Sequence, residues 1–198
     1  MAPELYLAST SPRRAALLRA AGVRFQLCEP GPEYAPGEGH EHTSLAGDPA
    51  AHAVERARRK GEGAAAPDPR VPVLAVDTVV DLDGVELGKP GDAAAAEAML
   101  RRLAGREHRV HTAHWLRVSA TGRVVEQIAS ATVRCGQPDE RLLRRYLDSG
   151  QWRGKAGSYG VQDDAQSFFR VVDGSFDTVV GLHVAAVRAL LARVREAT

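Results

Sequence analysis

The sequence predicts an α/β fold in which a mixed central sheet is flanked by helices. Three observations predict it: a short apolar strand at residues 4–8 runs directly into a helix, a continuous run of Val, Leu and Ala fills residues 71–82, and the later strands and helices mix irregularly with no internal repeat. At 198 residues the chain is long enough for one well-buried core, so we expect a single domain spanning residues 1–198.

The N-terminal elements follow from capping residues and periodicity. Ser11 is placed to cap a helix that begins at Pro12, where a missing N–H costs nothing, and Gly22 ends that helix. The expected elements that follow are, in order, a strand at 23–28, a long loop rich in Pro, Gly and His at 29–48, a polar helix with a thin apolar face at 49–60, and a linker at 61–70.

The strongest strand signal is at residues 71–82, where continuous apolar content predicts burial on both faces. Asp83 and Gly84 turn the chain, so that residues 85–87 pair back onto this strand. The remaining expected elements are a helix at 92–103, a hairpin of strands at 108–118 and 124–134, a helix at 139–149 capped by Asp139, a strand at 166–172, and a last helix from Thr178 or Leu182 to Glu196.

Composition excludes several classes of function. The 26 Lys and Arg balance 25 Asp and Glu, so we expect neither a nucleic-acid partner nor a membrane surface. Cys28 and Cys135 stand far apart with no CxxC spacing, which argues against a disulfide framework or a zinc site. The sequence shows no apolar run typical of a signal peptide or a membrane span, so we expect a soluble cytoplasmic protein. The sequence leaves the oligomeric state open, a homodimer included.

Asp77 is the sharpest single feature, because it interrupts the most apolar strand of the chain. An ionised carboxylate in such a place is costly unless it is paired or bound to a cation. The alternative is that the strand ends at Val76 and Asp77 begins a turn, but the apolar run continues through Val79 and Val80. A buried carboxylate could hold a divalent metal or activate a water.

Cationic residues occur where the backbone suits an anion. Arg13 and Arg14 open the first helix, whose N-terminal amides favour an anion, although an exposed basic pair explains them equally well. Lys89 stands between Gly88 and Pro90, and Lys155 lies in a glycine-rich stretch at 154–160. With Asp77 they suggest a polyphosphate held with a divalent ion, as in a nucleotide. The GxxxxGK[ST] signature of P-loop proteins does not occur.

Six short motifs follow one another along the chain. They are ASTSPRR at 8–14, VDTVV at 76–80, GKP at 88–90, MLRRLAG at 99–105 with His108, KAGSYGVQ at 155–162 and GSFDTVVGL at 174–182. In this order they resemble the Maf family of nucleoside triphosphate pyrophosphatases, and the resemblance runs from about residue 5 to residue 191. Each motif alone is weak, but the set is highly specific.

The resemblance implies a fold and a reaction. The fold is a cleft between two lobes, and the reaction cleaves between the α and β phosphates of a nucleoside triphosphate, with a divalent cation such as Mg²⁺ or Mn²⁺. It implies that Asp77 is the catalytic carboxylate and a metal ligand. The other residues implied in phosphate binding or catalysis are Ser9, Arg14, Lys60 and Lys89, and Lys155 is expected to bind substrate.

The resemblance also implies a substrate preference. Arg13, Thr78 and Gln162 match the branch that prefers dTTP and UTP, whereas the 7-methyl-GTP branch usually carries Trp, Gln and Glu at these positions. The sequence therefore predicts hydrolysis of dTTP, UTP or modified pyrimidine nucleotides.

Three departures from the family pattern bear on activity. The family's second acid is replaced by Tyr34, and Glu33, one residue earlier, is the candidate to substitute for it if the loop shifts. The usual Leu-Ala-x-x-Lys-Ala reads RARRKG at 56–61, and the usual Gly-Leu-Pro ends in His183. We therefore expect weak turnover, and a weakly active or inactive nucleotide-binding regulator of cell division remains the alternative.

Overall fold

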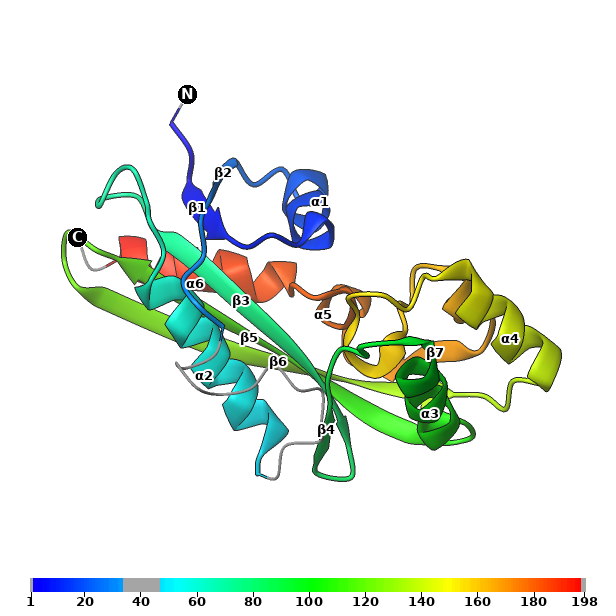
Figure 1. Ribbon diagram of the computed structural model, residues 1–198. Helices are drawn as coiled ribbons and strands as arrows, with labels where there is room; N and C mark the ends of the chain where they lie inside the picture. Colours follow the sequence, from blue (N-terminus) through cyan, green and yellow to red (C-terminus); the bar gives the residue numbers. More distant parts are fainter. Residues whose placement is uncertain (1, 34–46, 197–198) are drawn as a thin grey trace.

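One mixed sheet organises the molecule. The computed structural model describes residues 2–33 and 47–196, within which seven strands form a sheet of order β2-β1-β3-β5-β6-β7, with β4 paired to β3 (Figure 1). The strands are β1 (Leu5–Ala8), β2 (Phe25–Cys28), β3 (Val73–Leu82), β4 (Val85–Leu87), β5 (Glu107–Val118), β6 (Arg123–Cys135) and β7 (Phe169–Asp173). Strand β1 pairs in parallel with β2 and with β3, and the other pairings are antiparallel. This confirms the α/β fold class with a mixed sheet.

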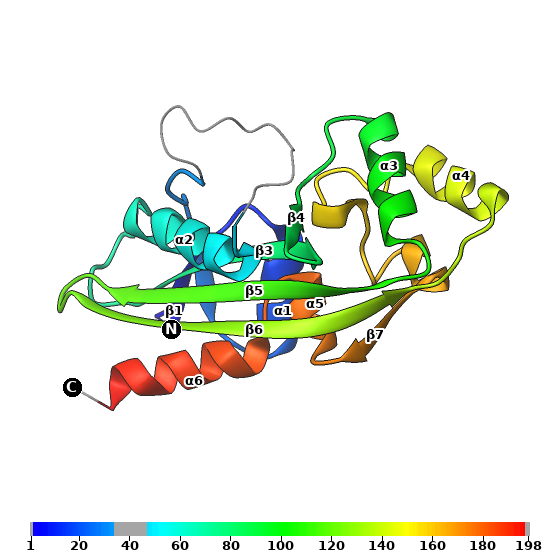
Figure 2. The ribbon, with the colours of Figure 1, turned by 90° about the horizontal axis from the view of Figure 1, so that it is seen from below.

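Helices cover both faces of this sheet. They are α1 (Pro12–Ala20), α2 (Pro49–Glu62), α3 (Ala93–Leu103), α4 (Glu140–Ser149), α5 (Phe176–Val180) and α6 (Val184–Arg195). Figure 2 shows α2 on one side of the long β5–β6 hairpin and α6 on the other, with α3 and α4 together at the far end. The carboxylate of Asp139 caps α4 by accepting from the Leu142 amide, as predicted, whereas Ser11 takes the cap position of α1 without a side-chain hydrogen bond.

The two largest of the four hydrophobic clusters among the described residues lie in two lobes. Strand β3 contributes Leu74 and Val76 to a core shared with α1 and α6, and Val80 and Leu82 to a core shared with α3 and α4. Because β3 runs through both, its middle residues lie between the lobes. This position is where Asp77 falls.

The edge of β3 is open at the same place. Strand β1 pairs with β3 only as far as Ala75, and β4 pairs with it only from Val80 onward. Within the described residues, positions 76–79 therefore have no neighbouring strand on that side. Consecutive residues of a strand point to opposite faces. At an open edge both faces are reachable from one side, so Asp77 and Thr78 can line the same cleft.

The structure corrects several predicted elements. Helix α2 extends through Gly61, which packs against the Trp115 ring, so the linker begins later than predicted. The face of α2 toward the sheet is not only apolar, because it buries Arg56 and Lys60. The last helix, α6, agrees with the later of its two predicted starts, Leu182. Residues 176–180 form a separate helix, α5, because Gly181 adopts a φ of 121° between them.

Strand β7 also begins later than predicted, because residues 164–167 form a 3₁₀ turn capped by the Asp163 carboxylate. Cys28 and Cys135 are free thiols, in line with the absence of a disulfide framework. Among the described helices, none combines the length and the apolar content that a membrane crossing requires.

Candidate active site

A cleft of about 410 Å³ opens at the unpaired edge of β3. Its walls come from the β1–α1 junction, the C-terminal end of α2, the middle of β3 and the loop that follows α4. The structure brings together all ten residues singled out from the sequence, since the lining includes Ser9, Arg13, Arg14, Glu33, Lys60, Asp77, Thr78, Lys89, Lys155 and Gln162. Tyr34 lies outside the described residues.

Two carboxylates meet on one ammonium group in this cleft. Lys60 Nζ donates to Asp77 Oδ1 at 2.6 Å and lies 3.2 Å from Glu33 Oε2. Lys89 Nζ lies 3.7 Å from the same Glu33 oxygen. Asp77 is 4% exposed, so its charge needs a partner, and Lys60 on the sheet-facing side of α2 supplies it. Strand β3 therefore continues past Val76, and Asp77 is a buried carboxylate within it.

Glu33 is held in its ionised form. Burial alone would raise its pKa, but the charges of Lys60 and Lys89, the hydrogen bond from Lys60 and the charge of Arg56 together lower the pKa of Glu33 below its usual value. Glu33 thus presents an ionised carboxylate to Lys60 and Lys89 in the cleft.

The second oxygen of Asp77 is different from the first. Asp77 Oδ2 is buried and accepts no hydrogen bond from the described residues, and Arg56 Nη1 lies 3.7 Å away. Buried carboxylate oxygens rarely stay without a partner. In the described part of the chain, no cluster of three or more His, Cys, Asp and Glu is suited to a metal. Asp77 and Glu33, which share Lys60, are nevertheless two carboxylates of the kind that would hold Mg²⁺ together with substrate phosphates.

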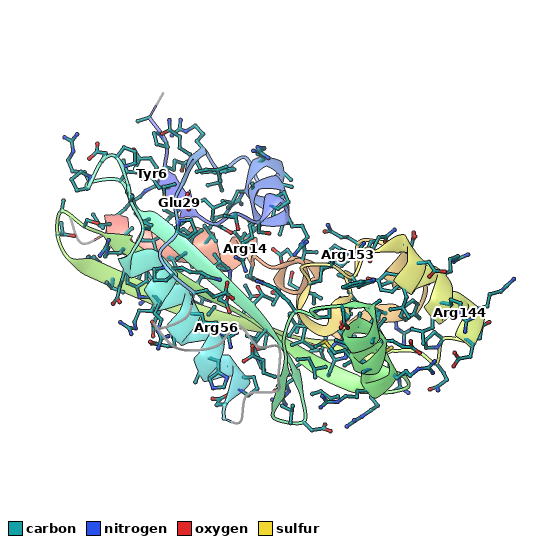
Figure 3. All side chains as sticks on the ribbon, viewed as in Figure 1. Tyr6, Arg14, Glu29, Arg56, Arg144 and Arg153 are labelled. Carbon is teal, nitrogen blue, oxygen red and sulfur yellow. The ribbon has the colours of Figure 1, made fainter. Side chains whose placement is uncertain are left out.

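Arg14 forms the opposite wall of the cleft. Its Nε donates to the Gly181 carbonyl at 2.8 Å, Nη1 to Ser9 Oγ at 3.2 Å and Nη2 to Thr78 Oγ1 at 3.2 Å. Burial lowers the pKa of Arg14, although the charges of Asp77 and Glu33 act against this. A guanidinium remains charged in proteins. These three acceptors are all neutral oxygens, so the positive charge of Arg14 is available to an anion in the cleft. Figure 3 labels Arg14 on α1, with Arg56 on α2.

Ser9 presents a hydrogen-bond donor. Its Oγ accepts from the Ser11 backbone amide and from Arg14 Nη1, both at 3.2 Å. A hydroxyl oxygen has two lone pairs and one hydrogen. Both lone pairs are therefore used, and among the described residues no acceptor is bonded to the Ser9 hydrogen. A phosphate oxygen is a suitable acceptor for it.

Thr78 presents a hydrogen-bond acceptor to the cleft, where Ser9 presents a donor. Thr112 donates to the Thr178 carbonyl at 2.8 Å, which uses its only hydrogen. In the 3.0 Å contact between Thr78 Oγ1 and Thr112 Oγ1, Thr78 must therefore be the donor. Since Thr78 also accepts from Arg14, one lone pair is left for a ligand. The side chain of Thr78 is held in one orientation.

The far wall comes from the loop after α4. Lys155 forms an ion pair with Asp163, so its charge is partly offset, and the Gly157 amide donates to the Gly88 carbonyl at 3.0 Å, which joins this loop to the segment of Lys89. Gln162 is exposed at the cleft. Arg153, labelled in Figure 3, also lines the cleft and stacks over the Trp152 ring at 4.8 Å.

Sequence reasoning missed three partners of these residues. The Gly181 carbonyl reaches Arg14 because α5 and α6 are separated there, and a glycine between the two predicted starts of the last helix is the available signal. Thr112 is a buried hydroxyl between His111 and Ala113 in β5, and the sequence gives no signal that marks it. In the sequence Arg56 stands out only as a departure from a motif, with no sign that it is buried.

Comparisons with known proteins agree on one family. A family model described as "Maf-like protein" matches residues 4–194. A Burkholderia pseudomallei (strain 1710b) protein named dTTP/UTP pyrophosphatase is 41% identical over 198 residues, covering 96% of this chain and 92% of that protein. A Thermus thermophilus protein of the same name is 44% identical over 189 residues, covering 96% and 94%. A third, from Bordetella pertussis, is 42% identical over 196 residues, covering 96% and 91%.

Proposed function

The chain belongs to the Maf family, and from that premise we propose that it is a nucleoside triphosphate pyrophosphatase that releases pyrophosphate from dTTP and UTP. The observation that carries the proposal is the pairing of Asp77 and Glu33 on Lys60 in the same cleft as Arg14, whose hydrogen-bond acceptors are neutral oxygens. Acidic groups for the water and cationic groups for the phosphates are the two components that this hydrolysis needs.

The β1–α1 junction is suited to binding the phosphates. The Ser9 hydroxyl and the first amides of α1 offer donors, and helix N-termini favour anions. Arg14, fixed by three acceptors, loses little freedom when it binds an oxygen anion. Arg13 and Lys89 line the same cleft and are assigned to the remaining phosphate charge. Together these groups stabilise the charge that develops on the leaving pyrophosphate.

The carboxylates are assigned to the water. Asp77 and the ionised Glu33 both line the cleft, so one of these carboxylates accepts a proton or orients the attacking water. Lys60 keeps the two carboxylates together. A divalent cation held by Asp77 and Glu33 would polarise the attacked phosphate and offset its charge.

The preference for dTTP and UTP rests on the named relatives and on three residues. Arg13, Thr78 and Gln162 all line the cleft, and Thr78 is held in one orientation by Thr112 and Arg14. We also propose that the chain works as one domain in the cytoplasm, where nucleoside triphosphates are made and used.

Release of pyrophosphate from a panel of nucleoside triphosphates, with Mg²⁺ or Mn²⁺, tests the proposal. We expect dTTP and UTP to give the highest kcat/KM and Asp77→Asn to abolish release. The matched control is Asp68→Asn, which removes a carboxylate that pairs with Arg70 and does not line the cleft. A protein that binds these nucleotides without turnover would instead be the regulatory alternative.

A further inference from the structure

A buried ion pair lies directly behind Asp77. Arg56 Nη1 donates to Glu86 Oε1 at 2.6 Å and Arg56 Nη2 to Glu86 Oε2 at 2.8 Å, in a bidentate pair. Both side chains are almost fully buried, with exposed fractions of 9% and 7%. His52 Nδ1, on the same face of α2, contacts Glu86 Oε2 at 3.0 Å. The pair joins α2 to β4, the strand that closes one side of the open edge of β3.

The position of the pair relative to Asp77 is specific. Arg56 Nη1 lies 3.7 Å from Asp77 Oδ2, within the range of an ion pair but too long for a hydrogen bond. Both terminal nitrogens of Arg56 donate to Glu86, which keeps the guanidinium from moving onto Asp77. Oδ2 therefore receives the attraction of a positive charge although no hydrogen bond from the described residues reaches it.

Stability alone does not explain this arrangement. Desolvating two charges costs several kcal/mol per ion, and replacing a buried pair by apolar residues of similar volume is often neutral or stabilising. The neighbouring positions on the same face, Ala53 and Ala57, pack in the ordinary way against Val79 and Trp115. An apolar side chain at position 56 would continue that packing.

We propose that Arg56, held by Glu86, is a positioning residue for Asp77 in the proposed hydrolysis, on which this inference rests. Lys60 fixes Oδ1 through a hydrogen bond, and Arg56 fixes Oδ2 by attraction across 3.7 Å. Rotation of the carboxylate must weaken both interactions. The carboxylate is thereby kept at the angle at which Asp77 lines the cleft. Small losses of alignment lower turnover strongly.

The test compares three variants with the parent. R56M/E86L replaces the pair by apolar side chains, R56K keeps a positive charge at position 56, and R58L/E62V removes an exposed ion pair elsewhere on α2 as the control. For each protein we measure kcat and KM with dTTP, the Kd of a non-hydrolysable α,β-methylene dTTP, and the thermal unfolding temperature.

We expect R56M/E86L to unfold near the parent temperature, to bind the analogue within about threefold of the parent, and to lose about tenfold or more in kcat. R56K keeps the charge without the bidentate hold, so we expect its kcat to lie between those of R56M/E86L and the parent, and R58L/E62V matches the parent in every measurement. Partial rescue by the retained charge, with binding unchanged, separates positioning of Asp77 from a structural role.

A folded R56M/E86L variant with the parent kcat overturns the inference, as does an R56K variant no better than R56M/E86L. If R56M/E86L does not fold, R56Q/E86Q is measured in its place, since it keeps hydrogen bonds at both positions and removes only the charges. A parent that releases no pyrophosphate from any nucleotide contradicts the proposed function itself, and the role of Arg56 with it. An active parent with unaffected variants contradicts only the role of Arg56.

Discussion

Glu33→Gln is the substitution that most sharply tests how this chain supplies its second acid. Glu33 lies 3.2 Å from Lys60 Nζ and 3.7 Å from Lys89 Nζ, and its side chain is 24% exposed. Glutamine keeps the shape and removes the charge. Lys60 keeps its 2.6 Å bond to Asp77, so the variant leaves no uncompensated buried charge and is expected to fold.

The expected loss of stability is small. Two charges about 4 Å apart attract by about 4 kcal/mol at an effective dielectric constant of about 20, but desolvation and side-chain ordering offset most of this. Because Glu33 is partly exposed, we expect a net loss of about 1 kcal/mol in the free energy of unfolding.

The pH dependence gives the sign of this effect. The pKa of Glu33 is lowered in the folded protein, so its contribution is present above the unfolded pKa and is lost as the pH falls through the folded pKa. The stability difference between parent and Glu33→Gln should therefore be largest near neutral pH and disappear in acid. Urea unfolding across this range measures it.

Turnover should respond far more than stability. If Glu33 orients the water or accepts its proton, kcat for dTTP falls by about a hundredfold. The control is Glu29→Gln, which removes a charge from the same segment at a position that does not line the cleft. A Glu33→Gln variant whose kcat lies within about twofold of the parent refutes the reasoning. In that case Glu33 only neutralises Lys60 and Lys89.

Three further predictions follow from the site and the core. Asp77→Asn should lower kcat by about a hundredfold or more with little change in stability, and near-parent turnover in the purified variant contradicts its assignment. Thr112→Val leaves the Thr178 carbonyl without its donor and should lower the unfolding free energy by about 1–2 kcal/mol, with Thr112→Ser restoring it; equal urea midpoints for all three proteins count against the hydrogen-bond chain. Burial lowers the pKa of His108 to about 4, so between about pH 6.5 and pH 4 the unfolded chain binds a proton at His108 and the folded chain does not. Its contribution to stability should fall by about 3 kcal/mol between about pH 6.5 and pH 4, and His108→Asn should remove that part of the acid sensitivity seen in the parent.

The elements with strong local signals were predictable from the sequence. The apolar run that became β3, the Asp139 cap of α4 and the turn at Asp83 each depend on neighbouring residues, and each is present. The separate short helix α5 was not predictable in this way. Gly181 is tolerated in a helical pattern, and only the packing of α5 beside Arg14 shows why the chain turns there.

Prediction of the candidate site from the sequence meets the same limit. The motifs contain residues that line one cleft, but their partners depend on tertiary contacts between segments far apart in sequence. Arg56 reads as a surface arginine in a polar helix, because the sequence does not show that Glu86 lies opposite it. Glu33 could be proposed as a substitute acid, but only the fold places it on Lys60. Periodicity predicts which face of a helix is buried and gives little information on which charges will pair there.

Phosphorus NMR of the products from dTTP tests the central claim most directly. With the parent protein and Mg²⁺, cleavage between the α and β phosphates gives dTMP and pyrophosphate in equal amounts, and the Asp77→Asn variant leaves dTTP intact. Appearance of dTDP with orthophosphate would contradict the account, because it places the attack on the terminal phosphate. Unchanged dTTP and UTP with the parent, at protein concentrations that bind them, would contradict it as well.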